Sequence, residues 1–326
     1  MSQRFLQHAQ GWVDNENLKK LSPEELERSE EKLTPYIPTI TSEIEGIREY
    51  LDGIVRKNRK KLKGKVHPQS FLGKYPIGQC KEIRDSVQDI MQSNNRQPSL
   101  PGLQAIRRYN KTSLAVVKGI WGIQNENNFQ NAIQVGGYCI DAALDTVDEP
   151  EPKVAVKRIE DCGIRNVEDF TDFADIAEKY WGEDLYPNIY VPQLAGIFPA
   201  ICITESGKIK FEGGCASVLG RNILSRGEDI PIFQNALDFT LKSQYSHKRL
   251  PDKYVDKLGR IFNTLRFDGS PVIKSLCDFE EEGCPLMTEA ALHQRVSDRV
   301  DGILDKHYDL AYFGLGKPLN EKGITA

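Results

Sequence analysis

Asn131-Ala-Ile-Gln-Val-Gly-Gly-Tyr-Cys-Ile-Asp141 is the stretch that decides the fold class. Apolar and β-branched residues on both sides of Gly136-Gly137 are typical of two strands joined by a tight turn. Another strand-like run, Leu114–Trp121, lies upstream. Because short turns join antiparallel strands, we expect an antiparallel sheet in this part of the chain.

An amphipathic helix is predicted upstream of these strands, opened by Gly78-Gln79. Its apolar positions have helical spacing and include a cysteine at the first: Cys80, Ile83, Val87, Ile90 and Met91. A thiol in the first turn of a helix lies at the positive end of the helix dipole, which lowers its pKa. This holds for an accessible thiol, because burial in an apolar setting raises the pKa instead.

Helix and linker signals divide the rest of the chain. Ser22-Pro23-Glu24-Glu25 combines a capping serine, a proline at the first helical position and a glutamate at the third, and a second helix is expected from near Ser42. Glu149-Pro-Glu-Pro152 predicts a linker. We therefore expect an α+β chain with a helical N-terminal arm over 1–65, an α+β unit over 66–150 and a mixed, mainly helical region over 151–326.

The last of these regions also carries local signals. They predict a helix over 167–180, a hairpin whose strands are 200–204 and 208–211, and a late helix over 288–308.

Composition excludes several classes of protein. Lys and Arg number 43 against 47 Asp and Glu, a net charge of −4, which argues against a dedicated binder of nucleic acid. No run of about 18 apolar residues is present, so no membrane partner is expected. Met1–His8 lacks the apolar core of a secretory signal. The seven cysteines are odd in number and scattered, which favours reduced thiols and a cytoplasmic location.

Two polar features are candidates for binding sites. Cys277, Cys284 and His293 do not have the spacing of common zinc sites, so no metal or other cofactor is expected. Residues 56–65 contain seven basic side chains in ten. Such a run binds phosphates in some proteins, but it has no interleaved aromatic residues, and cations also suit the end of a helix.

The order of the central features resembles the transglutaminase-like branch of the papain-like cysteine superfamily. In that branch Gly-x-Cys begins a helix, a strand follows, and then come His-Ala-x-Val-x-Val, a short turn and a strand ending in Asp. Residues 78–80, 131–135 and 138–141 match this order, and the resemblance covers about residues 75–147. It implies a papain/transglutaminase-like core of a helix and an antiparallel sheet. It also implies that Cys80 is the nucleophile, that Asp141 orients the base, and that the base position falls on Asn131.

Asn131 departs from the family pattern, because an amide does not accept a proton near pH 7 as imidazole does. No histidine lies between His67 and His247. Three hypotheses remain open: one of these two histidines supplies the base, Cys80 works as a thiolate stabilised by the helix terminus alone, or the fold is retained and catalysis is lost.

The turn length decides which side chains of the hairpin meet. A three-residue loop over 135–137 places Asn131 opposite Asp141, which would allow a side-chain hydrogen bond. A two-residue Gly-Gly loop places Asp141 on the face of Ala132 and Gln134 instead, because a shift of one residue exchanges the faces of a strand.

The leading functional prediction is a thiol-dependent enzyme of acyl transfer or of amide or thioester processing. Cys80 would attack a carbonyl and form a thioester, and backbone N–H groups at the start of its helix would stabilise the oxyanion. The substrate could be a protein glutamine, a peptide or an acyl thioester. The alternatives are a catalytically inactive transglutaminase-like binding or assembly module and, third, a nucleic-acid-associated protein that uses residues 56–65.

Overall fold

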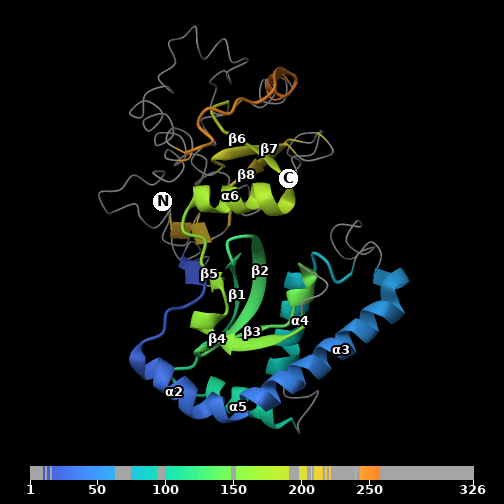
Figure 1. Ribbon diagram of the computed structural model, residues 1–326, viewed down its shortest axis with the longest axis vertical. Helices are drawn as coiled ribbons and strands as arrows, with labels where there is room; N and C mark the ends of the chain where they lie inside the picture. Colours follow the sequence, from blue (N-terminus) through green and yellow to red (C-terminus); the bar gives the residue numbers. More distant parts are fainter. Residues whose placement is uncertain are drawn as a thin grey trace. The chain divides into compact units, whose positions relative to one another are not determined.

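The computed structural model describes residues 17–62, 75–93, 100–147 and 152–190, with shorter stretches at 10–11, at 13–14 and between 198 and 258 (Figure 1). It contains two compact units, Asp14–Asn166 and, in the other, Val167–Ala326 with Met1–Val13. Helices and antiparallel sheets are both present, so the predicted α+β class is confirmed. None of the helices in the described ranges is long and apolar enough to cross a membrane.

The N-terminal helices follow their capping signals. Helix α2 (Pro23–Leu33) has the predicted capping box: the Glu25 N–H donates to Ser22 Oγ at 3.2 Å, and the Ser22 N–H donates to Glu25 Oε2 at 2.7 Å. Helix α3 (Ile37–Leu62) starts five residues before the predicted Ser42. The reason is that the 3₁₀ turn η1 (Thr34–Tyr36) leads directly into it, and Pro38 is tolerated in its first turn.

Helix α4 (Cys80–Gln92) begins at the predicted residue, and four of its predicted apolar positions are buried. Helix α5 (Pro101–Asn110) was not expected from the sequence. Its N-terminus is capped from α3, because the Glu43 carboxylate accepts the N–H groups of Gly102 and Leu103 at 3.0 and 2.7 Å. A partner some 60 residues away leaves no local signal.

The sheet of this unit has five antiparallel strands in the order β4-β3-β2-β1-β5. The strands are β1 (Val117–Gln124), β2 (Asn128–Val135), β3 (Tyr138–Asp141), β4 (Ala155–Arg158) and β5 (Ile164–Arg165). Strand β1 lies three residues downstream of its predicted position. Asn125 and Glu126 have φ values of 49° and 60°, and they make the β1–β2 turn a feature that the sequence analysis missed.

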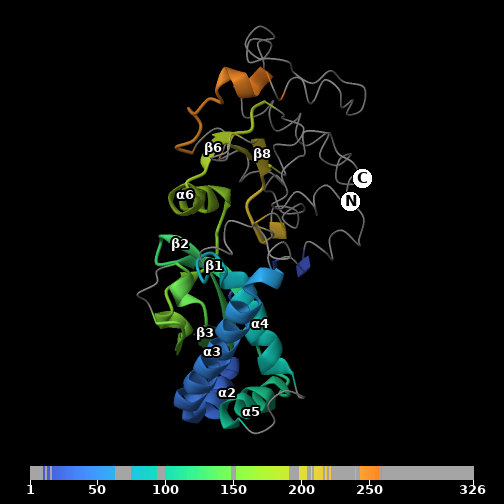
Figure 2. The same ribbon diagram turned by 90° about the vertical axis from the view of Figure 1, so that its right-hand side faces the viewer.

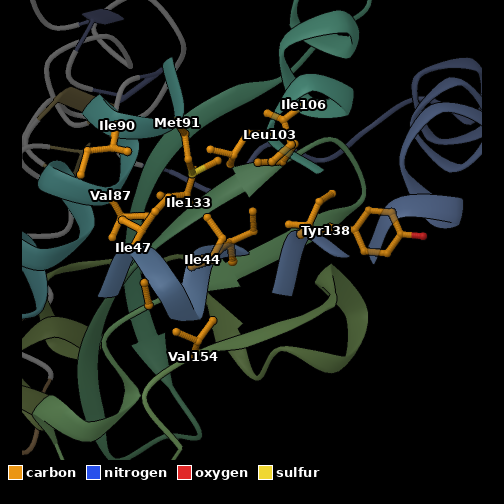
Figure 3. Packing of buried hydrophobic residues seen from close by; sticks show 14 of the residues in the cluster. Ile44, Ile47, Val87, Ile90, Met91, Leu103, Ile106, Ile133, Tyr138 and Val154 are labelled. Carbon is orange, nitrogen blue, oxygen red and sulfur yellow. The ribbon is translucent and has the colours of Figure 1, made fainter. Parts of the chain in front are cut away.

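The two faces of the sheet bury different clusters. One face packs against α3, α4 and α5, and Figure 3 shows the residues that meet there: Ile44, Ile47, Val87, Ile90, Met91, Leu103, Ile106, Ile133, Tyr138 and Val154. The second cluster contains Ile120, Ala132, Cys139, Cys162 and Ile164. Since Ala132 and Ile133 are neighbours in β2, the two clusters mark opposite faces. Figure 2 shows α3 and α4 side by side.

Two side-chain amides bind the backbone of the segment that precedes α2. Asn166 accepts the Leu18 N–H at 2.7 Å and donates to the Leu18 carbonyl at 3.0 Å. Gln134 does the same for Lys19, at 2.8 and 2.9 Å. Each amide therefore pairs with the backbone as a neighbouring strand would.

In the other unit, helix α6 (Phe170–Trp181) confirms the helix predicted over 167–180. Strands β6 (Asp184–Pro187), β7 (Ala200–Ile203) and β8 (Ile209–Glu212) form an antiparallel sheet, and the β7–β8 pair is the predicted hairpin. The helix predicted over 288–308 and the residues Cys277, Cys284 and His293 lie outside the described residues.

Candidate functional site

Cys80 is the first residue of α4 and is partly exposed. The turn that delivers it includes Gly78 at a φ of 71°, which favours glycine, and the Gly78 N–H donates to the Thr146 carbonyl at 3.1 Å. No side chain caps the start of α4. Gln79 is only 4% exposed, and its Nε2 has no hydrogen-bond partner among the described residues. The first turn of α4 therefore retains hydrogen-bond donors beside the thiol.

Asn131 lies against Cys80, as the resemblance implied for the base position. Its Nδ2 donates a hydrogen bond to the Cys80 sulfur at 3.2 Å. Asn131 is 5% exposed and belongs to β2, so the contact joins the start of α4 to the centre of the sheet. The structure thus brings two of the three predicted site residues into direct contact.

Arg84, one turn along α4, holds the other end of the Asn131 amide. Its Nη1 donates to Asn131 Oδ1 at 2.7 Å and to the Ile120 carbonyl at 3.2 Å. The guanidinium is also paired with Asp85, with Nη2 at 2.6 Å from Oδ1. Gly119 leaves the room for it, because a Cβ there would lie 3.2 Å from Arg84 side-chain atoms. Arg84 is therefore a positioning residue for Asn131.

Asp141 does not contact Cys80 or Asn131 directly. The β2–β3 register pairs Val135 with Tyr138 around a two-residue Gly-Gly turn, so the three-residue alternative is wrong. Continued by one pair, this register places Asp141 opposite Ala132, on the other face of the sheet from Asn131. Its carboxylate accepts from the Ala143 N–H at 2.8 Å and from Gln130 Nε2 at 3.0 Å.

Gln130 connects Asp141 to the backbone beside Cys80. Its Nε2 donates to Asp141 and, at 3.1 Å, to the Ala143 carbonyl, while its Oε1 accepts the Asn131 N–H at 3.1 Å. Asp141 thus orients Gln130, and through it the strand that carries Asn131, instead of orienting a base directly.

Burial shifts the pKa values of Cys80 and Asp141. Desolvation raises the pKa of the Cys80 thiol above its ordinary value. The Asn131 hydrogen bond opposes this rise, and the charges of Asp141 and Glu82 add to it. The direction is opposite to that expected for an accessible thiol at a helix N-terminus. Burial also raises the pKa of Asp141 to about 6, against the hydrogen bonds from Ala143 and Gln130.

An aromatic side chain stands on the Asn131 face of the sheet. Trp121 is paired directly with Asn131 across β1 and β2, so their side chains point to the same face. Its ring stacks on that of Phe129 with centroids 4.7 Å apart, and Trp121 is partly exposed whereas Phe129 is buried. The position of Trp121 makes it a candidate wall for a group bound at Cys80.

A buried ion network holds the chain segment that leads into Cys80. Arg48 of α3 is fully buried, and its guanidinium contacts Asp145 at 2.7 and 3.1 Å and Asp52 at 3.0 Å. The Tyr75 hydroxyl donates to Asp52 at 2.5 Å. Asp145 lies in the short 3₁₀ turn η3 (Leu144–Thr146), which also accepts the Gly78 N–H. The network therefore anchors η3 and the segment from Tyr75 to Gly78, which meet just before Cys80.

Sequence reasoning missed Arg84 and Arg48, and it considered Gln130 only as a base, a role to which an amide is unsuited. Arg84 interrupts the apolar stripe of α4, four residues after Cys80 and three before Val87, and that spacing was the available signal. Gln130 is one of four polar residues in the fully buried strand β2, so its position alone does not single it out. Of the histidines offered as a base, His67 lies outside the described residues and His247 belongs to the other unit. Within the described ranges, no group of three or more His, Cys, Asp or Glu side chains is arranged to hold a metal ion.

Comparison with known proteins adds no relative. No protein-family model, curated protein or solved structure matches the chain significantly.

Proposed function

We propose that this chain is a thiol-dependent acyl-transfer enzyme with Cys80 as its nucleophile, on a transglutaminase-like core. The observation that carries the proposal is the 3.2 Å hydrogen bond from Asn131 Nδ2 to the Cys80 sulfur at the start of α4. A donor aimed at sulfur favours the thiolate, the form that attacks a carbonyl. The order of helix, strand and hairpin around this contact supports the transglutaminase-like assignment.

The site also offers the donors that acyl transfer needs. A tetrahedral intermediate on Cys80 would place its oxyanion near the uncapped first turn of α4, whose N–H groups are suited to stabilise negative charge. The buried Nε2 of Gln79 is a further donor next to Cys80 in the chain.

The test is the capture of an acyl-enzyme. Native protein is incubated at pH 8 with a panel of acyl donors that includes thioesters and glutamine peptides, and every cysteine-containing peptide is then mapped by mass spectrometry. An acyl group on Cys80, formed faster than on the same residue in urea-unfolded protein, supports the proposal. Cys80→Ser should abolish the adduct, whereas Cys202→Ser, a buried thiol of the other unit, should leave it unchanged.

The second candidate is a catalytically inactive binding module of the same fold. An amide at the base position and the raised pKa of Cys80 favour it. In the capture experiment it corresponds to a folded protein in which Cys80 is acylated no faster than in the unfolded chain. The nucleic-acid hypothesis stays a prediction; α3 includes residues 56–62 of the basic run.

A further inference from the structure

The group fixed beside the Cys80 sulfur can only donate. A guanidinium has no hydrogen-bond acceptor, so the atom of the Asn131 amide that meets Arg84 Nη1 at 2.7 Å must be the oxygen. The amide nitrogen then faces sulfur. Asn131 and Arg84 are 5% and 7% exposed, so both ends of the amide are held inside the protein. Asn131 therefore stabilises charge on sulfur without taking up or delivering a proton.

The remaining charged neighbours of Cys80 do not replace a proton carrier. Both Asp141 oxygens accept hydrogen bonds from Gln130 and Ala143, and the register places Asp141 on the opposite face of the sheet. Glu82 is exposed on α4 and acts on the thiol through its charge. The Arg84 guanidinium offers hydrogen-bond donors only. The described part of Asp14–Asn166 contains no histidine.

A site of this composition discriminates between leaving groups. When an amide is cleaved, the departing nitrogen must receive a proton as its bond to carbon breaks, which is the task of a general acid. A thioester expels a thiolate, which needs no proton to leave. We infer that the acyl donor of this site is a thioester, not an amide. The inference rests on the proposed function and names its substrate class.

The reaction balances without a proton carrier. The Cys80 thiolate attacks the carbonyl carbon of R–CO–S–R′, a new carbon–sulfur bond forms, and the bond to R′S breaks with its electron pair leaving on R′S⁻. An amine then attacks the acyl group on Cys80, the Cys80 thiolate leaves, and the proton of the resulting ammonium group passes to solvent. Sulfur is the leaving group in both steps. In the second step the donor from Asn131 stabilises the charge on the released Cys80 thiolate.

The test uses the full chain and a matched pair of donors. The donors are the phenylacetyl thioester of N-acetylcysteamine and the phenylacetamide in which nitrogen replaces that sulfur; the aromatic acyl group suits the Trp121 ring. Hydroxylamine is the acceptor, and phenylacetyl hydroxamate is measured over many turnovers for wild type, Cys80→Ser and Asn131→His. Each rate is compared with that of urea-unfolded protein.

We expect wild type to turn over the thioester at least about tenfold faster than unfolded protein and to give no product from the amide. Asn131→His, which introduces a proton carrier beside sulfur, should gain measurable turnover of the amide. Turnover of the amide by wild type would overturn the inference and leave the proposed function standing. Turnover of neither donor, with no adduct on Cys80, would overturn the proposed function and the inference with it.

Discussion

The side-chain amide of Asn131 bridges the Cys80 sulfur and the Arg84 guanidinium, at 3.2 Å and 2.7 Å. The residue that the resemblance places at the base position therefore acts as a hydrogen-bond donor. Its orientation is set by an arginine from the same helix that carries the thiol.

Removal of this donor should raise the pKa of Cys80. In Asn131→Leu the shape of the side chain is nearly retained while the hydrogen bond is lost. The hydrogen bond favours the charged sulfur over the neutral thiol, so we expect the pKa of Cys80 to rise when it is lost. Site-resolved alkylation of Cys80 by iodoacetamide against pH measures it, with Asn127→Ala in the exposed β1–β2 turn as control. An unchanged or lowered pKa would show that the contact does not act on the thiolate.

Replacement of Arg84 should also raise the pKa of Cys80, here by changing which atom of the Asn131 amide faces the sulfur. In Arg84→Met the Asn131 amide is free to turn its oxygen toward sulfur, which disfavours the thiolate and raises the pKa of Cys80. Arg84→Lys keeps the charge and the ability to donate to the amide but loses the planar guanidinium, so its alkylation profile should lie between those of wild type and Arg84→Met. If both variants reproduced the wild-type profile at equal folded fraction, Arg84 would be structural only.

A side chain at position 119 should displace Arg84. A Cβ there would lie 3.0 Å from Gln88 Oε1 and 3.2 Å from Arg84 side-chain atoms, so these side chains must move, and Gly119→Ala should shift the Cys80 profile as Arg84→Met does. The matched control is Gly46→Ala in α3, where a Cβ meets nothing within 4 Å. Glycine within a helix costs about 0.5–1 kcal/mol relative to alanine, so the control should be stabilised by about that amount in urea denaturation.

Asp141 should make folding less favourable as the pH rises. Its pKa rises on folding from 3.8 to about 6, so the folded state binds its proton more tightly than the unfolded state does. The stability that this tightly bound proton contributes is fully present below about pH 4 and is lost as the pH rises through about 6. The stability of Asp141→Asn relative to wild type should therefore increase by up to about 3 kcal/mol between pH 4 and pH 7. Denaturation at both pH values measures this, and a pH-independent difference would contradict it.

Replacement of Arg48 should strongly lower the free energy of unfolding. Arg48→Met leaves Asp52 and Asp145 buried without their guanidinium, and removal of one partner of a buried ion pair typically costs about 3–5 kcal/mol. Arg158→Met breaks an exposed pair with Glu30 and should change the free energy of unfolding far less, because solvent screens such pairs. Equal losses in denaturation of the two variants would contradict a stabilising role for the network.

Local signals were enough for much of the fold. The Ser22 cap and the apolar spacing after Cys80 predicted where α2 and α4 begin, and Gly136-Gly137 predicted the hairpin. Helix α5 was missed because its cap comes from Glu43 in another helix. The Gly-Gly turn was compatible with two registers, and only the packing of both faces of β2 selects one. Arg84 and Gln130 act through contacts between elements far apart in the sequence, which no spacing rule reveals.

The two amides that hold Leu18 and Lys19 have a consequence for sequence variation. Every hydrogen bond that Asn166 and Gln134 make to these residues goes to backbone atoms. The side chains at 18 and 19 are therefore not selected by this contact, whereas Asn166 and Gln134 must keep both a donor and an acceptor. An alignment of related chains should show an invariant pair of carboxamides and an apolar residue at 18, where Leu18 packs against the cluster that contains Ile120. Position 19 should vary, except that proline would remove the required N–H.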